Sequence, residues 1–401
     1  MQPGTEKSAY PLASTTWGTE EVDAVQEVLK SGQFTMGKYV HAFEKEFAKY
    51  IGVKHAVMVN SGSSANLIML DGLKYRNSPL LKSGDEVIVP AVSWSTTFYP
   101  VSQIGLTLRF VDIDPSTLNI DVTQIEKAIT DKTRAILAVN LLGNPCAFDK
   151  LREICDKYDL LLIEDNCESL GAEFKGEKTG SIGICGSHSF FFSHHMCTME
   201  GGMVTTNDTE LYEAMHSLRA HGWIRGLPPK NSVSDHSSDP WVDQFKFVLP
   251  GYNFRPLEIE AAAGLAQLKK LPGFISARRE NAEYFLSRAI AFPQIRIQEE
   301  IGESSWFGFA ITLQGSLLGH RKELIQFLSE KGIETRPIVA GNFLNNPVIS
   351  LLEHSSVDQM ESAEIVDKEG FFIGNHHYPL KSELDFFFEA IENFIENLEV
   401  C

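Results

Sequence analysis

Short apolar runs alternate with helix-length stretches along the first half of the chain. The runs lie at residues 56–60, 86–91, 108–113, 134–141 and 160–165, and they do not alternate between apolar and polar positions. Strands buried on both faces have this pattern, and long connections between them are typical of parallel strands. The pattern predicts an α/β protein with a mainly parallel sheet covered by helices on both faces.

Helical patterns occur before and after the expected strands. The segment TEEVDAVQEVLKSG (19–32) has an apolar face, a candidate N-cap at Thr19 and Gly32 just past its end. After residue 250 we expect helices at 255–271, 273–291, 320–331 and 382–398 and a strand near 307–313. The Pro-, Ser- and Asp-rich stretch 226–250 is typical of a long surface excursion. It predicts a large domain at 1–250 and a smaller α+β domain at 251–401.

Composition narrows the function classes. A formal charge of −18 disfavours nucleic acid as a partner. No segment reaches the ~18 consecutive apolar residues of a membrane span, and the N-terminus lacks a signal-peptide pattern. We therefore expect a cytoplasmic protein without a membrane anchor. The six cysteines have no CxxC spacing, which predicts reduced thiols and no metal or iron–sulfur site; they are Cys146, Cys155, Cys167, Cys185, Cys197 and Cys401.

Small residues follow the first apolar run. In parallel sheets, ligands bind beyond the carboxyl ends of the strands. The run ending at residue 60 continues into SGSSAN (61–66), which opens a helix. Free N–H groups at a helix start suit a phosphate, although a helix cap by Ser61 or Ser63 would explain the same residues.

Two further strand ends carry groups that suit a nitrogen-containing ring. Trp94, in VSWSTTF, can stack on such a ring, or it can pack in a core or an interface. Asp165 ends LLLIED and can pair with a protonated ring nitrogen, or cap a helix; Glu168 lies a short turn further on. A phosphate site, an aromatic face and an acid together fit pyridoxal 5′-phosphate (PLP).

The order and spacing of these motifs resemble the PLP-dependent sugar aminotransferases of the DegT/StrS group, which have the aspartate-aminotransferase type I fold. The resemblance covers nearly the whole chain, through SGQFTMGKYVHAFEKEFAKYIGVKHAVMVNSGSSANLIML, IEDNCESLGAEFKG, EGGMVTTND and GYNFRPLEIEAAAGLAQL. It implies a homodimer, because in that family the partner chain completes the active site.

The resemblance implies a phosphate site built from two strand ends and the partner. Gly62 and Ser63 would bind the phosphate through backbone amides, with Ser64 beside them. Ser189 would add a hydroxyl group, and Asn253 would reach the phosphate from the other subunit.

It also assigns the ring contacts. Trp94 would lie on the ring face, Asp165 would bind the pyridine nitrogen, and Glu168 would lie near the ring hydroxyl. Aminotransferases of the group usually have glutamine at this last position.

The stretch SFFFSHHMCTMEGG (189–202) departs from the family at one position. Where the aminotransferases carry the lysine that binds PLP covalently, six residues before the acid of EGG, this chain has His194. No lysine lies between Lys178 and Lys230. Imidazole cannot hold the aldehyde covalently, but it can act as a general base. A decayed, inactive enzyme and an engineered replacement are the alternatives. For His195 we expect a structural role, and for Cys197 and Met199 packing.

Histidine in place of the lysine, Glu168 and ETRPIVAGNF (334–343) resemble one subgroup, the nucleotide-sugar 3-dehydratases. Some of these carry a cysteine-ligated iron–sulfur cluster, whereas residues 222–250 contain no cysteine, so the chain resembles the cluster-free kind. The resemblance implies PLP- and pyridoxamine-phosphate (PMP)-dependent removal of the C3 hydroxyl from a nucleotide-linked 4-keto-6-deoxyhexose, with glutamate as amino donor. A PMP-dependent lyase or aminotransferase-like enzyme on another keto sugar and a noncatalytic PLP-fold sensor are the alternatives.

Several further residues are candidates for substrate binding. Arg336 can bind the carboxylate of the amino donor in bidentate fashion. Arg219, His221 and Arg225, in LRAHGWIR, can contact the nucleotide diphosphate, or they can form a solvated helix end. Phe245 can approach the partner's cofactor or pack in a core.

Overall fold

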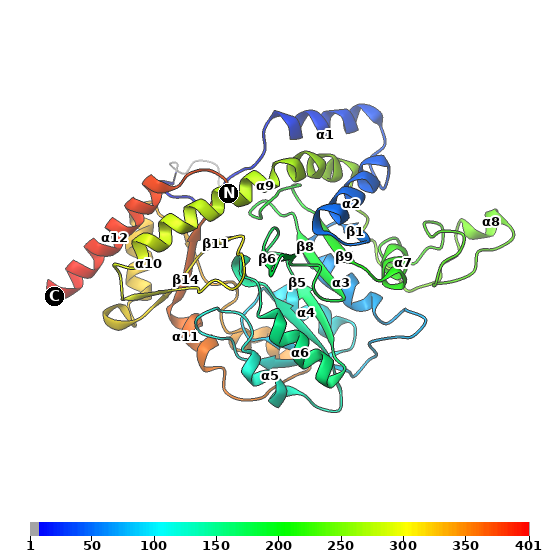
Figure 1. The fold of residues 1–401 in the computed structure, drawn as a ribbon. Helices are drawn as coiled ribbons and strands as arrows, with labels where there is room; N and C mark the ends of the chain where they lie inside the picture. Colours follow the sequence, from blue (N-terminus) through cyan, green and yellow to red (C-terminus); the bar gives the residue numbers. More distant parts are fainter. Residues whose placement is uncertain (1–7, 401) are drawn as a thin grey trace.

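An eight-stranded sheet lies at the centre of the computed structural model, which describes residues 8–400 (Figure 1). Its strand order is β1-β9-β8-β5-β4-β2-β3-β13. The pairings make every strand parallel to the rest except β9, which is antiparallel to both β1 and β8. The predicted mainly parallel sheet is therefore confirmed. Its strands are β1 (His55–Val59), β2 (Glu86–Pro90), β3 (Thr107–Val111), β4 (Thr133–Val139), β5 (Leu161–Asp165), β8 (Cys185–Ser189), β9 (Gly202–Thr206) and β13 (His354–Ser356).

Helices cover both faces of this sheet, because successive strand residues point to opposite sides. Val57 and Val59 belong to the core beneath α3, α4 and α7, whereas Met58 belongs to the core beneath α2. Ile88 and Val111 pack with α5 and α6. The covering helices are α2 (Lys38–Ile51), α3 (Gly62–Gly72), α4 (Ser95–Gln103), α5 (Val122–Ala128), α6 (Phe148–Tyr158) and α7 (Thr209–Leu218).

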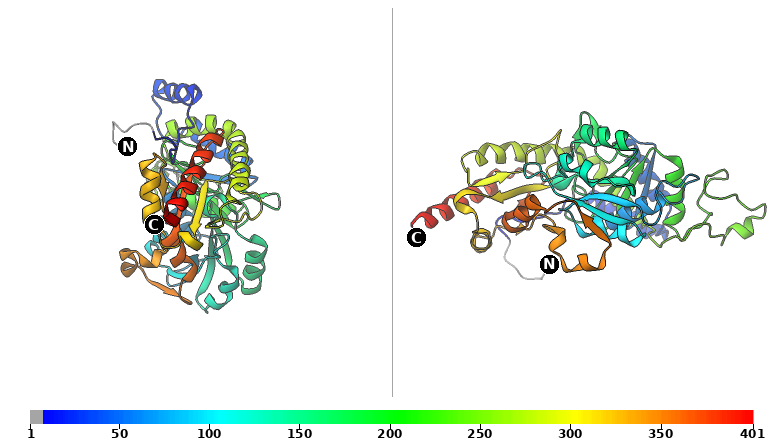
Figure 2. Two further views of the ribbon diagram at one scale, coloured as in Figure 1. Left: turned by 90° about the vertical axis from the view of Figure 1, so that its left-hand side faces the viewer. Right: turned by 90° about the horizontal axis from the view of Figure 1, so that it is seen from below.

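A second, four-stranded sheet follows in the C-terminal part, with the order β10-β11-β14-β12. Its own apolar core lies against α9, α10 and α12 (Figures 1 and 2). The predicted strand near 307–313 and the helices near 320–331 and 382–398 are confirmed. The elements are β10 (Ile295–Ile297), β11 (Gly308–Leu313), α10 (Arg321–Glu330), β12 (Thr335–Arg336), β14 (Gly370–Gly374) and α12 (Lys381–Val400).

One expectation about the helices is wrong. The two helices expected at 255–271 and 273–291 form a single helix, α9 (Glu258–Ala289), with Pro272 inside it. Proline lacks the N–H that an interior helix position donates and normally kinks the helix. Leu271 and Ile275 are buried against α2 on either side of this position, so tertiary packing keeps the helix continuous.

The two sheets exchange segments of chain. Tyr10, near the N-terminus, lies in the core of the smaller sheet, and β13 near residue 355 joins the large sheet beside β3. The division of the chain at residue 250 stays a prediction. The remaining elements are α1 (Thr19–Ser31), β6 (Glu173–Phe174), β7 (Glu177–Lys178), α8 (Pro240–Asp243) and α11 (Glu361–Glu369). Thr19 begins α1, and the N-cap position falls on Gly18 instead.

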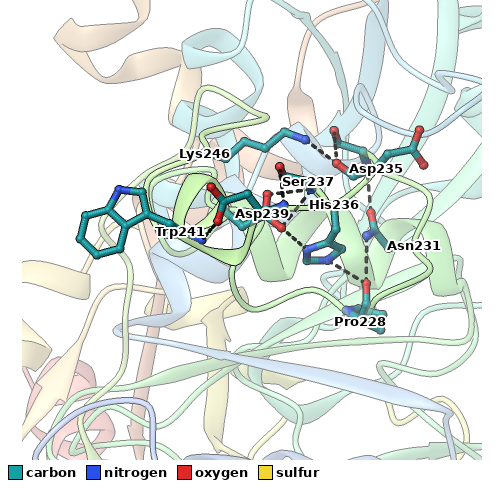
Figure 3. A network of polar contacts seen from close by, with 10 residues as sticks. Pro228, Asn231, Asp235, His236, Ser237, Asp239, Trp241 and Lys246 are labelled. Carbon is teal, nitrogen blue, oxygen red and sulfur yellow. Dashed lines mark hydrogen bonds and ion pairs between the residues drawn. The ribbon is translucent and has the colours of Figure 1, made fainter.

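The segment 226–250 projects from the rest of the molecule, with α8 near its tip (Figure 2). Polar contacts within the segment define its shape (Figure 3). His236 contacts Asp243 (Nδ1–Oδ2 2.8 Å) and the carbonyl of Pro228 (3.1 Å), and the Trp241 N–H donates to Asp239 (2.9 Å). A surface excursion was predicted here, and the structure has one.

Candidate active site

The carboxyl ends of β1, β2, β4, β5 and β8 meet at one edge of the large sheet, because these strands run in the same direction. Contacts link the residues that follow them. A Cβ placed on Gly62, after β1, would lie 2.6 Å from the Ser189 Cβ, at the end of β8, and 3.1 Å from the Cys167 Sγ. The Ser63 hydroxyl donates to Thr96 after β2 (2.9 Å). Residues far apart in sequence thus line one site.

The turn between β1 and α3 leaves an anion-binding corner. The Ser61 side chain caps α3 by accepting the Ser64 N–H (3.1 Å). The amides of Gly62 and Ser63, in the first turn, have no acceptor within the helix, and the Ser189 hydroxyl lies beside them. The cap expected as an alternative therefore coexists with free amides of the kind that suit a phosphate. On the other side, Gly202 is tight against the Ser61 carbonyl, where a Cβ would lie 2.3 Å from the oxygen.

Filling this corner should damage both packing and phosphate binding. We expect Gly62→Ala to lower the free energy of unfolding by about 1–3 kcal/mol, as overpacking does, and to weaken PLP binding. Urea unfolding and titration with PLP measure the two effects. Gly273→Ala is the matched control: its Cβ meets nothing within 4 Å inside α9, so we expect about 0.5–1 kcal/mol of stabilisation and unchanged PLP affinity. Equal PLP affinity in both variants would contradict the assignment.

Asp165 ends β5 and is 5% exposed. Its Oδ2 accepts hydrogen bonds from Asn66 Nδ2 (2.8 Å) and Thr97 Oγ1 (2.7 Å), and its Oδ1 accepts from the Cys167 N–H (3.2 Å). All these donors are neutral, so they orient the carboxylate without neutralising it. An anion fixed in this way suits a protonated ring nitrogen.

Trp94 directly precedes α4 and is 59% exposed. A core position is therefore wrong for this side chain, and the stacking and interface alternatives remain. Two residues further along the chain, Thr96 accepts from the Ser63 hydroxyl (2.9 Å) and, through its carbonyl, from Asn66 (3.1 Å).

Glu168 has an unusual environment for a carboxyl group. Its Oε2 accepts the Leu142 N–H (3.1 Å), and Leu142 has a left-handed φ of 52°, which costs of order 1 kcal/mol for a leucine and often marks a functional site. Burial, together with the charge of Asp165, raises the pKa of Glu168 to about 7. The group can therefore exchange a proton near neutral pH.

His194 lies in the loop between β8 and β9. Its backbone N–H donates to the Phe191 carbonyl (2.9 Å), and its imidazole ring packs edge-on against the Phe307 ring (centroids 5.2 Å apart). Burial, reinforced by the positive charge of Arg278, lowers the pKa of the imidazole to about 4. The ring is thus neutral at pH 7, which is the form that a general base requires. Its buried Nδ1 has no hydrogen-bond partner among the described residues.

His195 differs from its neighbour. It is fully buried, and its Nε2 lies 3.0 Å from the Ser305 carbonyl, which anchors the loop to the C-terminal part of the chain. The expected structural role is confirmed. Cys197 is buried as expected, whereas Met199 is 40% exposed, so its predicted packing does not occur within this chain.

Arg219 corrects the sequence interpretation. It is fully buried, and its Nη1 bonds the Glu44 carboxylate and the Met58 carbonyl (2.6 Å). The charge is therefore paired inside the protein, and the side chain is neither a solvated helix end nor placed to contact a diphosphate. Arg225, by contrast, is exposed and lies over the Trp223 ring.

Three further predicted residues, one for the cofactor and two for the substrate, lie at the surface. The Asn253 side chain is exposed and accepts from Arg255 (3.0 Å), and its backbone pairs with Ala220, next to His221. Phe245 is 71% exposed, so it does not pack in this chain's core. Arg336 is exposed on β12 and has no carboxylate partner among the described residues. Their roles stay predictions.

The sequence interpretation missed three groups that shape the site: Asn66, Thr97 and the Leu142 N–H. Asn66 was visible in SGSSAN and Thr97 in WSTTF, but nothing in either motif indicates that both point at a carboxylate on β5. The Leu142 amide has no sequence signal at all.

PLP fits the residues that are present. A corner of free amides and a hydroxyl matches its phosphate, the fixed carboxylate of Asp165 matches its ring nitrogen, and the exposed Trp94 offers a ring face. Within residues 8–400, no group of histidine, cysteine and acidic side chains could hold a metal ion, and no helix could cross a membrane. The five cysteines of this range have free thiols; Cys401 lies outside it.

These features define a PLP-dependent enzyme with the aminotransferase fold. Residues 16–383 match the DegT/DnrJ/EryC1/StrS aminotransferase family, and the chain belongs to that family. It is 52% identical over 385 residues to GDP-4-keto-6-deoxy-D-mannose 3-dehydratase of Escherichia coli O55:H7, which covers 96% of this chain and 99% of the relative. The enzyme of the same name from Yersinia pseudotuberculosis is 51% identical over 96% of this chain and 98% of its own.

Two solved structures of proteins with these names have the same fold as this chain. The E. coli GDP-4-keto-6-deoxy-D-mannose-3-dehydratase with bound hydrated PLP has a TM-score of 0.94 at 51% identity, covering 96% of this chain and 100% of that one. A GDP-4-keto-6-deoxymannose-3-dehydratase with a trapped PLP-glutamate geminal diamine has a TM-score of 0.93 at 52% identity, covering 95% and 99%. The expected fold and cofactor are confirmed.

Proposed function

We propose that this protein is a homodimeric, cytoplasmic 3-dehydratase that uses PLP and PMP to remove the C3 hydroxyl from a nucleotide-linked 4-keto-6-deoxyhexose, with glutamate as amino donor. The observation that carries the proposal is a half-buried, neutral His194 at the position of the family's lysine, in a chain whose other residues fit the phosphate and the ring nitrogen of PLP. The names of the two 3-dehydratases that match along nearly their full length support GDP as the nucleotide and 4-keto-6-deoxymannose as the sugar.

Different residues of this chain have different roles in the proposed reaction. When bound, the pyridoxamine form of the cofactor supplies an amine for the C4 ketone and an electron sink for loss of the hydroxyl. Asp165 holds the ring nitrogen in its protonated state. His194 takes a proton from the methylene carbon next to the ring. Because no lysine lies between Lys178 and Lys230, the family's position for the proton-transferring amine is taken by an imidazole, which would favour release of the nitrogen as ammonia over amino transfer.

A second subunit would complete the site. The projecting segment exposes apolar side chains, with Trp241 76% and Phe247 55% exposed. An isolated chain gains nothing from such exposure, whereas a second copy that covers these rings would be stabilised by their burial. In the dimer, Asn253 reaches the partner's phosphate, and Phe245 approaches the partner's cofactor. His221 contacts the nucleotide diphosphate. Arg336 binds the glutamate carboxylate.

The test is incubation with glutamate and a set of 4-keto-6-deoxy nucleotide sugars. We expect glutamate to convert the aldehyde absorbance of bound PLP to that of the amine form. With the correct sugar, ammonia and 2-oxoglutarate should form in equal amounts during each turnover. PLP that stays unchanged in glutamate would contradict the proposal and favour a sensor. An amino sugar as product, without ammonia, would show an aminotransferase.

A further inference from the structure

A buried arginine on α9 lies behind the loop that carries His194. Arg278 is 4% exposed, and its Nη1 donates to the carbonyl oxygens of Phe307 (3.0 Å) and Asn375 (2.6 Å). These acceptors are neutral, and the arginine forms no ion pair with any carboxylate in residues 8–400. Burying an uncompensated charge is costly. A residue that only held the segment together would not need to carry one.

One of these acceptors, the Phe307 carbonyl, belongs to the segment that touches both His194 and His195. The ring of Phe307 packs against His194 (centroids 5.2 Å apart) and against His195 (5.7 Å). The Ser305 carbonyl, two residues earlier, contacts His195 Nε2 (3.0 Å). The guanidinium and the two imidazoles therefore share one short support, residues 305–307.

The same support is fixed from the large sheet. Its N–H groups at Ser305 and Phe307 donate to Gly143 (2.9 Å) and Leu142 (3.0 Å). The position of the His194 ring is thus set by contacts from two sides, and Arg278 supplies the contact from α9.

The charge of Arg278 also acts on His194. Burial lowers the pKa of its guanidinium to about 10, so it remains protonated at pH 7, and its charge adds to burial in lowering the pKa of His194. The same charge lowers the pKa of three other histidines, which are His195, His376 and His377. The charge of Lys270 also acts on His377, and the charge of Glu383 acts on His376.

We propose that Arg278 is a positioning residue for His194: it fixes the imidazole through Phe307, and its buried positive charge adds to burial in disfavouring protonation of that imidazole. The proposal depends on the proposed function only for the role of His194 as base. After the base has taken its proton, the same charge disfavours retention of that proton and promotes its transfer onward.

The test is a direct titration of His194 in the cofactor-free protein. With isotopically labelled histidine, NMR resolves the imidazole signals of the 12 histidines, and His194→Gln identifies the signal of interest by its absence. In Arg278→Gln, which keeps a donor but loses the charge, we expect the pKa of His194 to rise by about 1 unit or more. In Arg278→Lys, which keeps the charge, it should stay near the wild-type value.

Arg288→Gln is the matched control, because it removes a charge from the same helix at a half-buried pair with Asp385. This variant should leave the pKa of His194 unchanged. An unchanged titration in Arg278→Gln would overturn the proposal. So would a His194 pKa near 6.5 in the wild-type protein, which needs no variant to fold. If the titration shifts while the acidic limb of the dehydration rate does not follow it, Arg278 acts as proposed but His194 is not the base.

Discussion

Replacement of His194 by glutamine is expected to lower kcat for dehydration by about 10²–10⁴-fold, the usual contribution of general acid–base catalysis. Glutamine fills similar space but cannot accept a proton at neutral pH. The affinity for PLP should change little, since His194 makes no hydrogen bond to the phosphate corner or to Asp165. Ammonia release measures kcat, and absorbance titration measures PLP binding.

Two comparisons make this result specific. His354→Gln, at an exposed histidine of β13, should leave kcat unchanged. His194→Lys should attach PLP covalently and suppress dehydration. Undiminished dehydration in the lysine variant would exclude His194 as the base.

Removal of the charge at Asp165 is expected to weaken cofactor binding most. Asp165→Asn leaves the ring nitrogen without a buried anionic partner, and loss of one member of such a pair costs about 2–5 kcal/mol, or roughly 30- to 5,000-fold in affinity. The variant keeps an oxygen that can accept from Asn66 or Thr97, so the fold should survive. Equilibrium titration with PLP gives the dissociation constant.

The control for this variant is Asp159→Asn. Asp159 is an exposed residue in the left-handed conformation after α6, where asparagine is well tolerated. The Asp159→Asn variant should bind PLP with the same affinity as the wild-type protein. Equal affinity in Asp165→Asn would show that the carboxylate does not pair with the ring.

Local sequence patterns predicted the strands whose carboxyl ends form the candidate site. The five apolar runs correspond to β1–β5, and Asp165 was placed at a strand end on the pattern alone. The prediction failed where a distant residue decides the outcome. LRAHGWIR looks like a solvated helix end, but Glu44, 175 positions away, pairs with Arg219 inside the core. Likewise, the local sequence predicts that a helix ends near Pro272, but packing against α2 keeps α9 continuous across this residue.

The neutral donors around Asp165 have a thermodynamic consequence. Asn66 and Thr97 fix the carboxylate but leave its charge unmatched within the described chain, and the position of the family's PLP-tethering lysine is His194. Every contact with the cofactor is therefore reversible, and binding to the native state alone stabilises it by RT ln(1 + [L]/Kd). Resistance to unfolding should rise with the free concentration of PLP, so that the protein's lifetime reports the supply of its cofactor.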